Sequence, residues 1–290
     1  MAAQNIALAM STYERGEVLL LSSKDAFQLQ SKSVPAHRPL GLSLDEKSNL
    51  VIAEKTGISR VNWKKNIPMV MEYWPTGNLD LHDLFWCHNK ALAVNTKFNR
   101  ISWIDHQKIC DAWLPFFIDK NNRNFDACHL NGMAVYRNKL IAATALGHST
   151  KHQGWRDNII EGGILMDTQD NKMLLEGLGM PHSPRYINGK VFFLQSAFGF
   201  LSIFNLQSKQ MKNISIGGLL RGLSFLGDYA FIGRSKIRKN SKTFAKLPEA
   251  HRNYQAGVVV FHVPSEQIVS ECILPPEIEE TYDILPIPMS

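Results

Sequence analysis

The chain has 290 residues, of which 44% are hydrophobic and 20% are charged, and its formal net charge is +6. This composition is that of an ordinary soluble globular protein without low-complexity tracts. The first residues lack a basic segment followed by a long apolar core, and no stretch approaches roughly 18 apolar residues, so we expect neither a secretory signal nor a membrane association. The basic residues are spread out, which argues against nucleic acid and suits either solubility or attraction of an anionic ligand.

The four cysteines, Cys87, Cys110, Cys128 and Cys272, are scattered along the chain without CxxC spacing. That spacing favours neither a disulfide framework nor a zinc site. We therefore expect free thiols and a cytoplasmic location.

The first predicted element is an inner strand at 7–12, because ALAMST there matches ALAVNT at 91–96 at an offset of 84 residues. The strand that precedes the later copy has no counterpart before residue 7. The segment TYDILPI (281–287) resembles LDLHDLF (79–85). We therefore expect the C-terminal strand to lie beside the first strand and to supply the missing partner.

One unit is repeated along the chain, with copies at 41–55, 82–96, 131–145, 182–196 and 220–235. The second and fourth copies align without a gap at an offset of 100 residues, which places His82 on His182 and Lys90 on Lys190. The third copy has Asn131 in the place of His82. Each copy contains a short strand, a turn and a continuous apolar run, which is typical of strands buried on both faces.

A further strand follows most copies, at 101–105, 162–167, 200–205 and 256–263. A period of about 40 to 55 residues with three or four strands is the signature of a propeller blade. The sequence therefore predicts an all-β fold: a single six-bladed β-propeller domain over 1–290, whose ring is closed by pairing of the C-terminal strand with the N-terminal blade. Closure of this kind removes exposed sheet edges. The one candidate helix is 247–255.

Six motifs carry a family resemblance: HDL (82–84), VNTKF (94–98), CHLNGM (128–133), GWR (154–156), MPHSPR (180–185) and RGLSF (221–225). In this order, over nearly the whole chain, they resemble an uncharacterised and mainly bacterial family. The resemblance implies a fold and a site location rather than a reaction. More distantly, the architecture is similar to the gluconolactonase, strictosidine synthase and paraoxonase propellers, which bind calcium at the funnel. Since the matching positions here are poor in carboxylates, the resemblance does not imply a calcium site in this chain.

The repeat alignment defines two columns of mostly polar residues. The first column lies near the start of each unit and contains Gly41, His82, Asn131, His182, Leu220 or Arg221, and Tyr282. The second lies at the end of each apolar run and contains Ser11, Glu54, Asn95, Thr144, Gln195, and Gly233 or Arg234. Polar groups beside buried runs need partners or a water-filled cavity, and the central channel of a propeller is such a cavity.

His82 and His182 are expected about 120° apart around a six-fold ring. Together with His129 they could converge on one ligand or one divalent metal, or act as general acid and base. The alternative is that each histidine bonds a neighbouring backbone group and holds the blades in register. Glu54, the one carboxylate of the second column, is the candidate base or metal ligand there. The predicted catalytic residues are thus His82, His182 and Glu54, and the predicted metal ligands are His82, His182 and His129.

A further set of residues is predicted to bind the ligand without taking part in the chemistry. These residues are Asn95, His129, Asn131, Trp155, Arg156, Arg185, Gln195, Arg221, Tyr282 and Asp283. Arginine suits carboxylate, sulfate or phosphate, so Arg185 and Arg221 either grip an anion or form internal salt bridges with Asp83 or Asp283. Asp83 and Asp283 either serve a ligand or catalytic group, or bond backbone donors of the next blade.

Two long segments are expected to interrupt blades. In 145–163, Trp155 either stacks on a sugar or aromatic ring beside an anion-binding Arg156, or anchors the loop to the core. The basic loop 234–252, with Arg238, Lys239 and Lys242, either forms the opposite wall or is a solvated loop.

No GxSxG, P-loop, HExxH or GxGxxG motif is present. Cys128 beside His129 is either a reactive thiol or a buried blade cysteine. Two functions remain open: an acid–base enzyme of hydrolase, lyase or isomerase type, with or without a divalent metal, acting on a small anionic or sugar-like molecule or modified peptide; or a non-catalytic sensor or scaffold that binds a ligand or peptide. Fold alone does not separate them.

Overall fold

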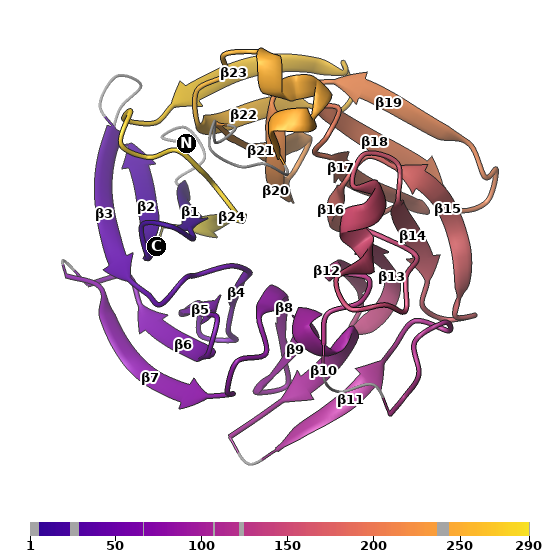
Figure 1. Cartoon of the computed structure of the whole chain (residues 1–290). Helices are drawn as coiled ribbons and strands as arrows, with labels where there is room; N and C mark the ends of the chain where they lie inside the picture. Colours follow the sequence, from indigo (N-terminus) through magenta and orange to yellow (C-terminus); the bar gives the residue numbers. More distant parts are fainter. Residues whose placement is uncertain are drawn as a thin grey trace.

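Six four-stranded antiparallel sheets form a ring in the computed structural model (Figure 1), so the protein is a six-bladed β-propeller as the repeats predict. The structure describes residues 6–23, 29–65, 67–106, 108–121, 125–236 and 244–289. Within these ranges, no helix is both long enough and apolar enough to cross a membrane.

The strands run from the innermost to the rim in each blade. The blade shared by the termini holds β24 (Ile284–Pro288), β1 (Ile6–Thr12), β2 (Glu17–Ser23) and β3 (Leu29–Pro35). The next two hold β4 (Leu42–Leu44), β5 (Leu50–Ala53), β6 (Gly57–Asn62) and β7 (Met69–Pro75), then β8 (Leu81–Cys87), β9 (Lys90–Asn95), β10 (Arg100–Ile104) and β11 (Ile109–Trp113). The fourth holds β12 (Leu130–Tyr136), β13 (Lys139–Ala145), β14 (Gly163–Asp167) and β15 (Lys172–Leu178). The last two hold β16 (Pro181–Ile187), β17 (Lys190–Gln195), β18 (Phe200–Asn205) and β19 (Met211–Ser215), then β20 (Leu219–Leu226), β21 (Tyr229–Ser235), β22 (Gly257–His262) and β23 (Gln267–Ile273).

The ring closes by pairing of β24 with β1 in one sheet (Figure 1). β24 pairs antiparallel with β1, from Ile6 opposite Pro288 to Met10 opposite Ile284. The Tyr282 N–H extends the pairing by donating to the Ser11 carbonyl at 2.8 Å. The predicted closure by 281–287 is therefore confirmed.

The apolar runs of the second strands are the best buried parts of the fold. Leu50–Ala53 and the run 191–194 are buried at every position, because neighbouring blades cover both faces of these strands. The rim strands, by contrast, are largely exposed, as in β11 and β23. Burial on two faces explains why the second strands read as continuous apolar runs rather than as alternating ones.

Hydroxyl groups fasten neighbouring blades at the ends of the second strands. Each bonds a backbone carbonyl where the next innermost strand begins: Ser11 to Leu40 (2.5 Å), Thr96 to Leu130 (2.6 Å), Ser196 to Leu220 (2.5 Å) and Ser235 to Thr281 (2.9 Å). Buried hydroxyls need such partners. Polar residues at these positions therefore hold adjacent blades in register.

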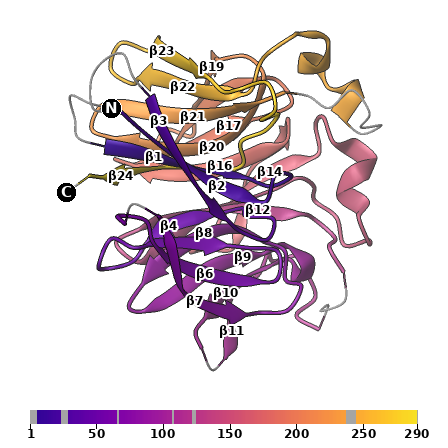
Figure 2. The same cartoon turned by 90° about the vertical axis from the view of Figure 1, so that its left-hand side faces the viewer.

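Two inserted segments rise from the same face of the ring, as Figure 2 shows. The first lies between β13 and β14, as predicted, and contains the short 3-10 helix η3 (Gly154–Asn158). The second contains η4 (Phe244–Lys246) and η5 (Pro248–His251). The helix predicted at 247–255 is thus a 3-10 turn of four residues, because Leu247 and Arg252 on either side of it have extended backbones and no side chain caps its first turn.

Candidate functional site

A cavity of about 340 Å³ lies where several inner strands begin, and the two insertions contribute Trp155 and Phe244 to its lining. Its lining residues are Tyr13, Glu14, Leu40, Asp80, His82, His129, Trp155, Arg156, Arg221, Phe244, Glu280 and Tyr282. Six of the predicted site residues therefore meet here, from segments spread over most of the chain: His82, His129, Trp155, Arg156, Arg221 and Tyr282.

Irregular pairing of the inner strands presents these side chains. The register of β8 shifts between Leu81 and Leu84, at His82, and that of β20 shifts between Leu220 and Leu223, at Arg221. Such bulges bend a strand and re-aim its side chains. In β20 the bulge depends on Gly222, whose φ is +77° and where an added Cβ would lie 2.8 Å from the Cα of Asp283.

His129 is the most firmly oriented polar side chain of the cavity. Its Nδ1 lies 2.7 Å from Oδ2 of Asp126, and its backbone N–H donates to Oδ1 of the same carboxylate at 2.7 Å. The indole N–H of Trp155 donates to Asp126 Oδ2 at 2.9 Å. This arrangement fixes the imidazole, and among the described residues Nε2 of His129 has no hydrogen-bond partner.

Asp126 belongs to the site although sequence reasoning missed it. Burial raises the pKa of its carboxyl group, but the hydrogen bond and charge of His129 outweigh burial and leave the pKa below its ordinary value. The carboxylate therefore stays ionised beside the imidazole. Its one signal in the sequence is the spacing of three residues before His129, which no other repeat copies.

His82 and His182 make the same backbone contact, as their equivalent positions suggest. Nδ1 of His82 lies 2.9 Å from the Asp80 carbonyl, and Nδ1 of His182 lies 2.9 Å from the Met180 carbonyl. A carbonyl only accepts, so Nδ1 carries the proton in both rings. Burial is the main cause that lowers the pKa of both side chains, so both imidazoles are neutral near pH 7.

The two histidines differ in their surroundings. The His82 ring packs edge-on against the rings of His129 (centroids 4.8 Å apart) and Tyr282 (5.6 Å). His182 is buried, does not line the cavity, and also contacts the Ser196 hydroxyl at 3.2 Å. Among the described residues, no cluster of three His, Cys, Asp or Glu side chains has the geometry of a metal site. A metal at His82, His182 and His129 stays a prediction.

Arg221 and Tyr282 form the wall beside His82. The guanidinium carbon of Arg221 lies 5.4 Å from the centre of the Tyr282 ring and 5.8 Å from that of Phe244. Burial raises the pKa of the Tyr282 phenol well above its ordinary value, so the hydroxyl keeps its proton. The cavity thus offers a cation and a protonated phenol opposite an oriented imidazole.

Four predicted site residues lie elsewhere, in internal hydrogen bonds at the blade junctions. Asn95 accepts from Phe98 N–H (3.3 Å), Asn131 donates to the Pro181 carbonyl (3.0 Å), Gln195 accepts from Gly179 N–H (2.9 Å), and Glu54 accepts from His37 N–H (2.5 Å) and from the Ser59 hydroxyl. None of the four lines the cavity. Their positions give no support to the predicted ligand-binding and catalytic roles.

Arg185 and Asp283 line a separate cavity of about 270 Å³, further along the same inner strands. Arg185 lies 3.1 Å from Asp83 and 3.6 Å from Asp283, measured between guanidinium nitrogen and carboxylate oxygen. Arg185 was predicted either to bind an anion or to form an internal salt bridge, and these distances are those of the salt bridge. Burial raises the pKa of Asp283 to about 7, although the charge of Arg185 opposes the rise.

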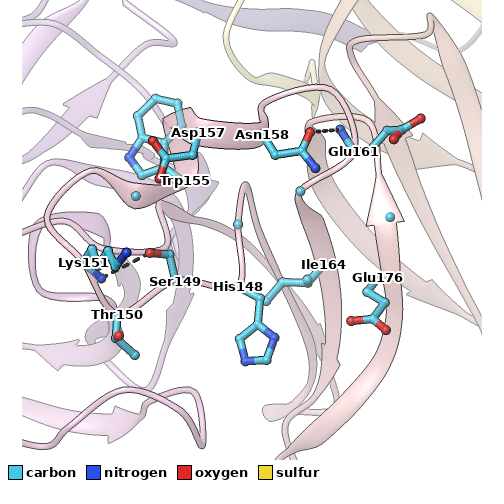
Figure 3. A pocket seen from close by; sticks show the side chains of 14 residues that line it. His148, Ser149, Thr150, Lys151, Trp155, Asp157, Asn158, Glu161, Ile164 and Glu176 are labelled. Atoms are coloured by element: carbon cyan, nitrogen blue, oxygen red, sulfur yellow. Dashed lines mark hydrogen bonds between the residues drawn. The ribbon is translucent and has the colours of Figure 1, made fainter.

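Trp155 anchors the first insertion. It is 5% exposed, and its ring lies 4.4 Å from the His129 ring and 4.0 Å from the guanidinium carbon of Arg156. These contacts leave little of the indole face for stacking on a sugar. A separate hollow of about 650 Å³ is lined mostly by residues of this insertion, among them His148, together with Glu176 of β15 (Figure 3). Apart from Trp155, no predicted site residue lines it.

Cys128 and the basic loop 234–252 are the two remaining features singled out in the sequence. Cys128 is fully buried, and burial raises the pKa of its thiol, so the buried-cysteine alternative describes it. Arg238, Lys239 and Lys242 of the basic loop lie outside the described residues. Arg234, at the start of that loop, pairs with Glu271 at 2.6 Å.

Fold and cavity together define a six-bladed β-propeller with a polar, histidine- and arginine-lined cavity among its inner strands. Residues 1–290 match the family described as "Domain of unknown function (DUF4915)", and the chain belongs to this family. A search of curated proteins finds no significant match.

Solved structures show the same fold at low sequence identity. A chain in the crystal structure of a nidogen/laminin complex matches with a TM-score of 0.64 and 11% identity, over 98% of this chain and 99% of that chain. A protein of unknown function from Bacteroides caccae matches with a TM-score of 0.64 and 9% identity, over 98% and 99%. At such identities the likeness concerns the fold alone.

Proposed function

We propose that the cavity lined by His82, His129 and Arg221 is the active site of an acid–base enzyme in which His129 is the general base. The observation that carries the proposal is the 2.7 Å contact between Nδ1 of His129 and the ionised carboxylate of Asp126. A carboxylate in this position holds an imidazole in one tautomer and stabilises the imidazolium that forms when Nε2 takes a proton.

The other lining residues supply complementary roles. The protonated phenol of Tyr282 and the guanidinium of Arg221 stabilise negative charge that develops on the substrate. His82, neutral and packed on both His129 and Tyr282, fixes the distance between base and phenol. The substrate is a small anionic or sugar-like molecule or a modified peptide, and hydrolase, lyase and isomerase chemistry can all begin with this proton transfer.

The test is a conversion screen. Purified protein is incubated with mixtures of small organic acids, phosphate esters, sugars and peptides, and time-dependent changes are followed by mass spectrometry. His129→Gln is the test variant, and His152→Gln, an exposed histidine of the same insertion, is its matched control. Conversion should fall by about 10²-fold or more in His129→Gln and stay unchanged in the control.

Two results would overturn the enzyme assignment. One is conversion that is equal in the wild type and in His129→Gln. The other is a screen in which no compound is converted, although at least one compound binds the wild type stably in calorimetry. The second result would identify a binding propeller of the sensor or scaffold kind instead.

A further inference from the structure

Arg221 differs from the other shielded arginines of the described chain because it has no carboxylate. The paired ones are Arg60 with Glu72 (2.6 Å), Arg100 with Asp111 (2.6 Å), Arg185 with Asp83 (3.1 Å) and Arg234 with Glu271 (2.6 Å). Arg221 is also partly buried, yet among the described residues it has neither an ion pair nor a hydrogen bond, and its Nε is fully covered. A shielded cation without a counter-charge is costly.

The surroundings of Arg221 hold its guanidinium in place but accept none of its hydrogen bonds in the described structure. The rings of Tyr282 and Phe244 contact it, and aromatic faces attract a guanidinium without accepting its fork of N–H donors. The hydroxyl of Tyr282, a residue 8% exposed, is likewise buried without a partner in the described structure. Two neighbouring donors thus lack acceptors on one wall of the cavity.

Two arginines and three carboxylates line the cavity. Arg156 stacks on Trp155, and within the described residues its side chain donates to the neutral amide oxygen of Gln153, at 3.1 Å. Of the carboxylates, Asp80 lies 3.9 Å from Nδ1 of His82, and Glu280 accepts the backbone N–H of Glu14, the third acidic residue, at 2.5 Å. In the described structure none of the three pairs with Arg221, so its N–H donors remain available to an anion of the ligand.

We infer that Arg221 and Tyr282 bind an oxyanion of the ligand, a carboxylate or a phosphate, with Arg156 as a second cation at the rim. Guanidinium forks match both oxyanions with paired hydrogen bonds, and the phenol supplies a further donor. This inference deepens the proposed function and rests on it only in placing the anion in the cavity that His129 faces. The substrate is then a small acid or phosphate ester rather than a neutral sugar.

The test measures binding without turnover. Inorganic phosphate and acetate are titrated separately into the wild type by isothermal calorimetry, and the two arms show which oxyanion the site prefers. Arg221→Gln should weaken binding of the preferred anion by about tenfold or more, and Tyr282→Phe should weaken it several-fold. Lys47→Gln removes an equal charge at an exposed position outside the cavity and should bind as the wild type does.

A wild type that binds neither anion would overturn the inference, as would Arg221→Gln binding with unchanged affinity. Arg221→Lys keeps the charge but not the fork; an affinity several-fold weaker than that of the wild type supports the assignment even if the glutamine variant folds poorly. His129→Gln should bind the anion normally. Normal anion binding together with unchanged turnover in His129→Gln would refute the acid–base proposal alone. Unchanged anion affinity in Arg221→Gln, together with lost turnover in His129→Gln, would refute the anion site alone.

Discussion

Asp83 and Asp283 make the same pair of backbone contacts in two different blades. Each accepts the N–H of the residue that follows it, Leu84 or Ile284, at 2.9 Å. Each also accepts an N–H from the next inner strand, that of Met133 at 3.0 Å for Asp83 and that of Leu42 at 2.9 Å for Asp283. Arg185 forms ion pairs with both carboxylates and a hydrogen bond with Asp83, so one guanidinium links β16 to the inner strands of two other blades.

Arg185→Gln should destabilise the propeller. The substitution leaves two buried carboxylates without their shared counter-ion, and breaking a buried charge cluster typically costs about 3 kcal/mol of unfolding free energy. Urea unfolding followed by tryptophan fluorescence measures the loss. The control is Arg15→Gln, which breaks an exposed pair with Glu17 and should cost less than about 1 kcal/mol. Equal losses of unfolding free energy in the two variants would show that Arg185 does not stabilise the contact between the blades.

Asp283 should make stability depend on pH in a distinctive direction. Its folded pKa is about 7, above the unfolded value of about 3.9. The native state therefore binds more protons between these values, and the contribution of this group to stability is full below about 3.9 and is lost as the pH rises through about 7.

Asp283→Asn removes this titration. Unfolding free energies of wild type and variant, measured by urea at intervals from pH 5 to 8, should differ increasingly in the variant's favour as the pH rises towards 8, relative to their difference at pH 5. Because groups away from this charge cluster titrate alike in both proteins, the changing difference reports on Asp283 and its immediate neighbours. A difference that stays constant, or changes in the opposite direction, would contradict the raised pKa.

The repeats predicted the fold well because equivalent positions in a ring of blades have equivalent backbone surroundings. The matching Nδ1 contacts of His82 and His182 illustrate this. The site was harder to predict, because a functional cavity depends on what differs between blades. Only His82 has His129 and Tyr282 beside it, whereas His182 is buried.

Polar residues of the two columns were hard to assign a role from the sequence for a related reason. The sequence indicates that Asn95, Asn131 and Gln195 must be satisfied where the chain is buried, but it does not indicate by what. In the fold, backbone groups and neighbouring side chains satisfy them. Asp126 was missed because it precedes the repeat unit and has no counterpart in the other copies.

Asp126→Asn should separate catalysis from ligand binding. The amide carries no charge to stabilise an imidazolium and presents a different set of donors to Nδ1 of His129, so conversion should fall by about 10²-fold. Phosphate or acetate affinity, which depends on Arg221, should change little. A loss of affinity as large as the loss of rate would instead mean that Asp126 merely supports the cavity through Trp155.

Gly222→Ala should disturb the anion site through the backbone. A Cβ at residue 222 would lie 2.8 Å from the Cα of Asp283, at a φ of +77° that alanine rarely adopts. The bulge that presents Arg221 must then shift, and we expect a loss of at least about 2 kcal/mol in unfolding free energy together with weaker anion binding.

The matched control is Gly227→Ala in the same blade, where φ is +57° but nothing lies within 4 Å of the added Cβ. That variant should cost only about 1 kcal/mol, for the left-handed backbone, and keep the anion affinity of the wild type. Equal effects of the two substitutions on affinity would show that the close approach of β20 to Asp283 does not position Arg221.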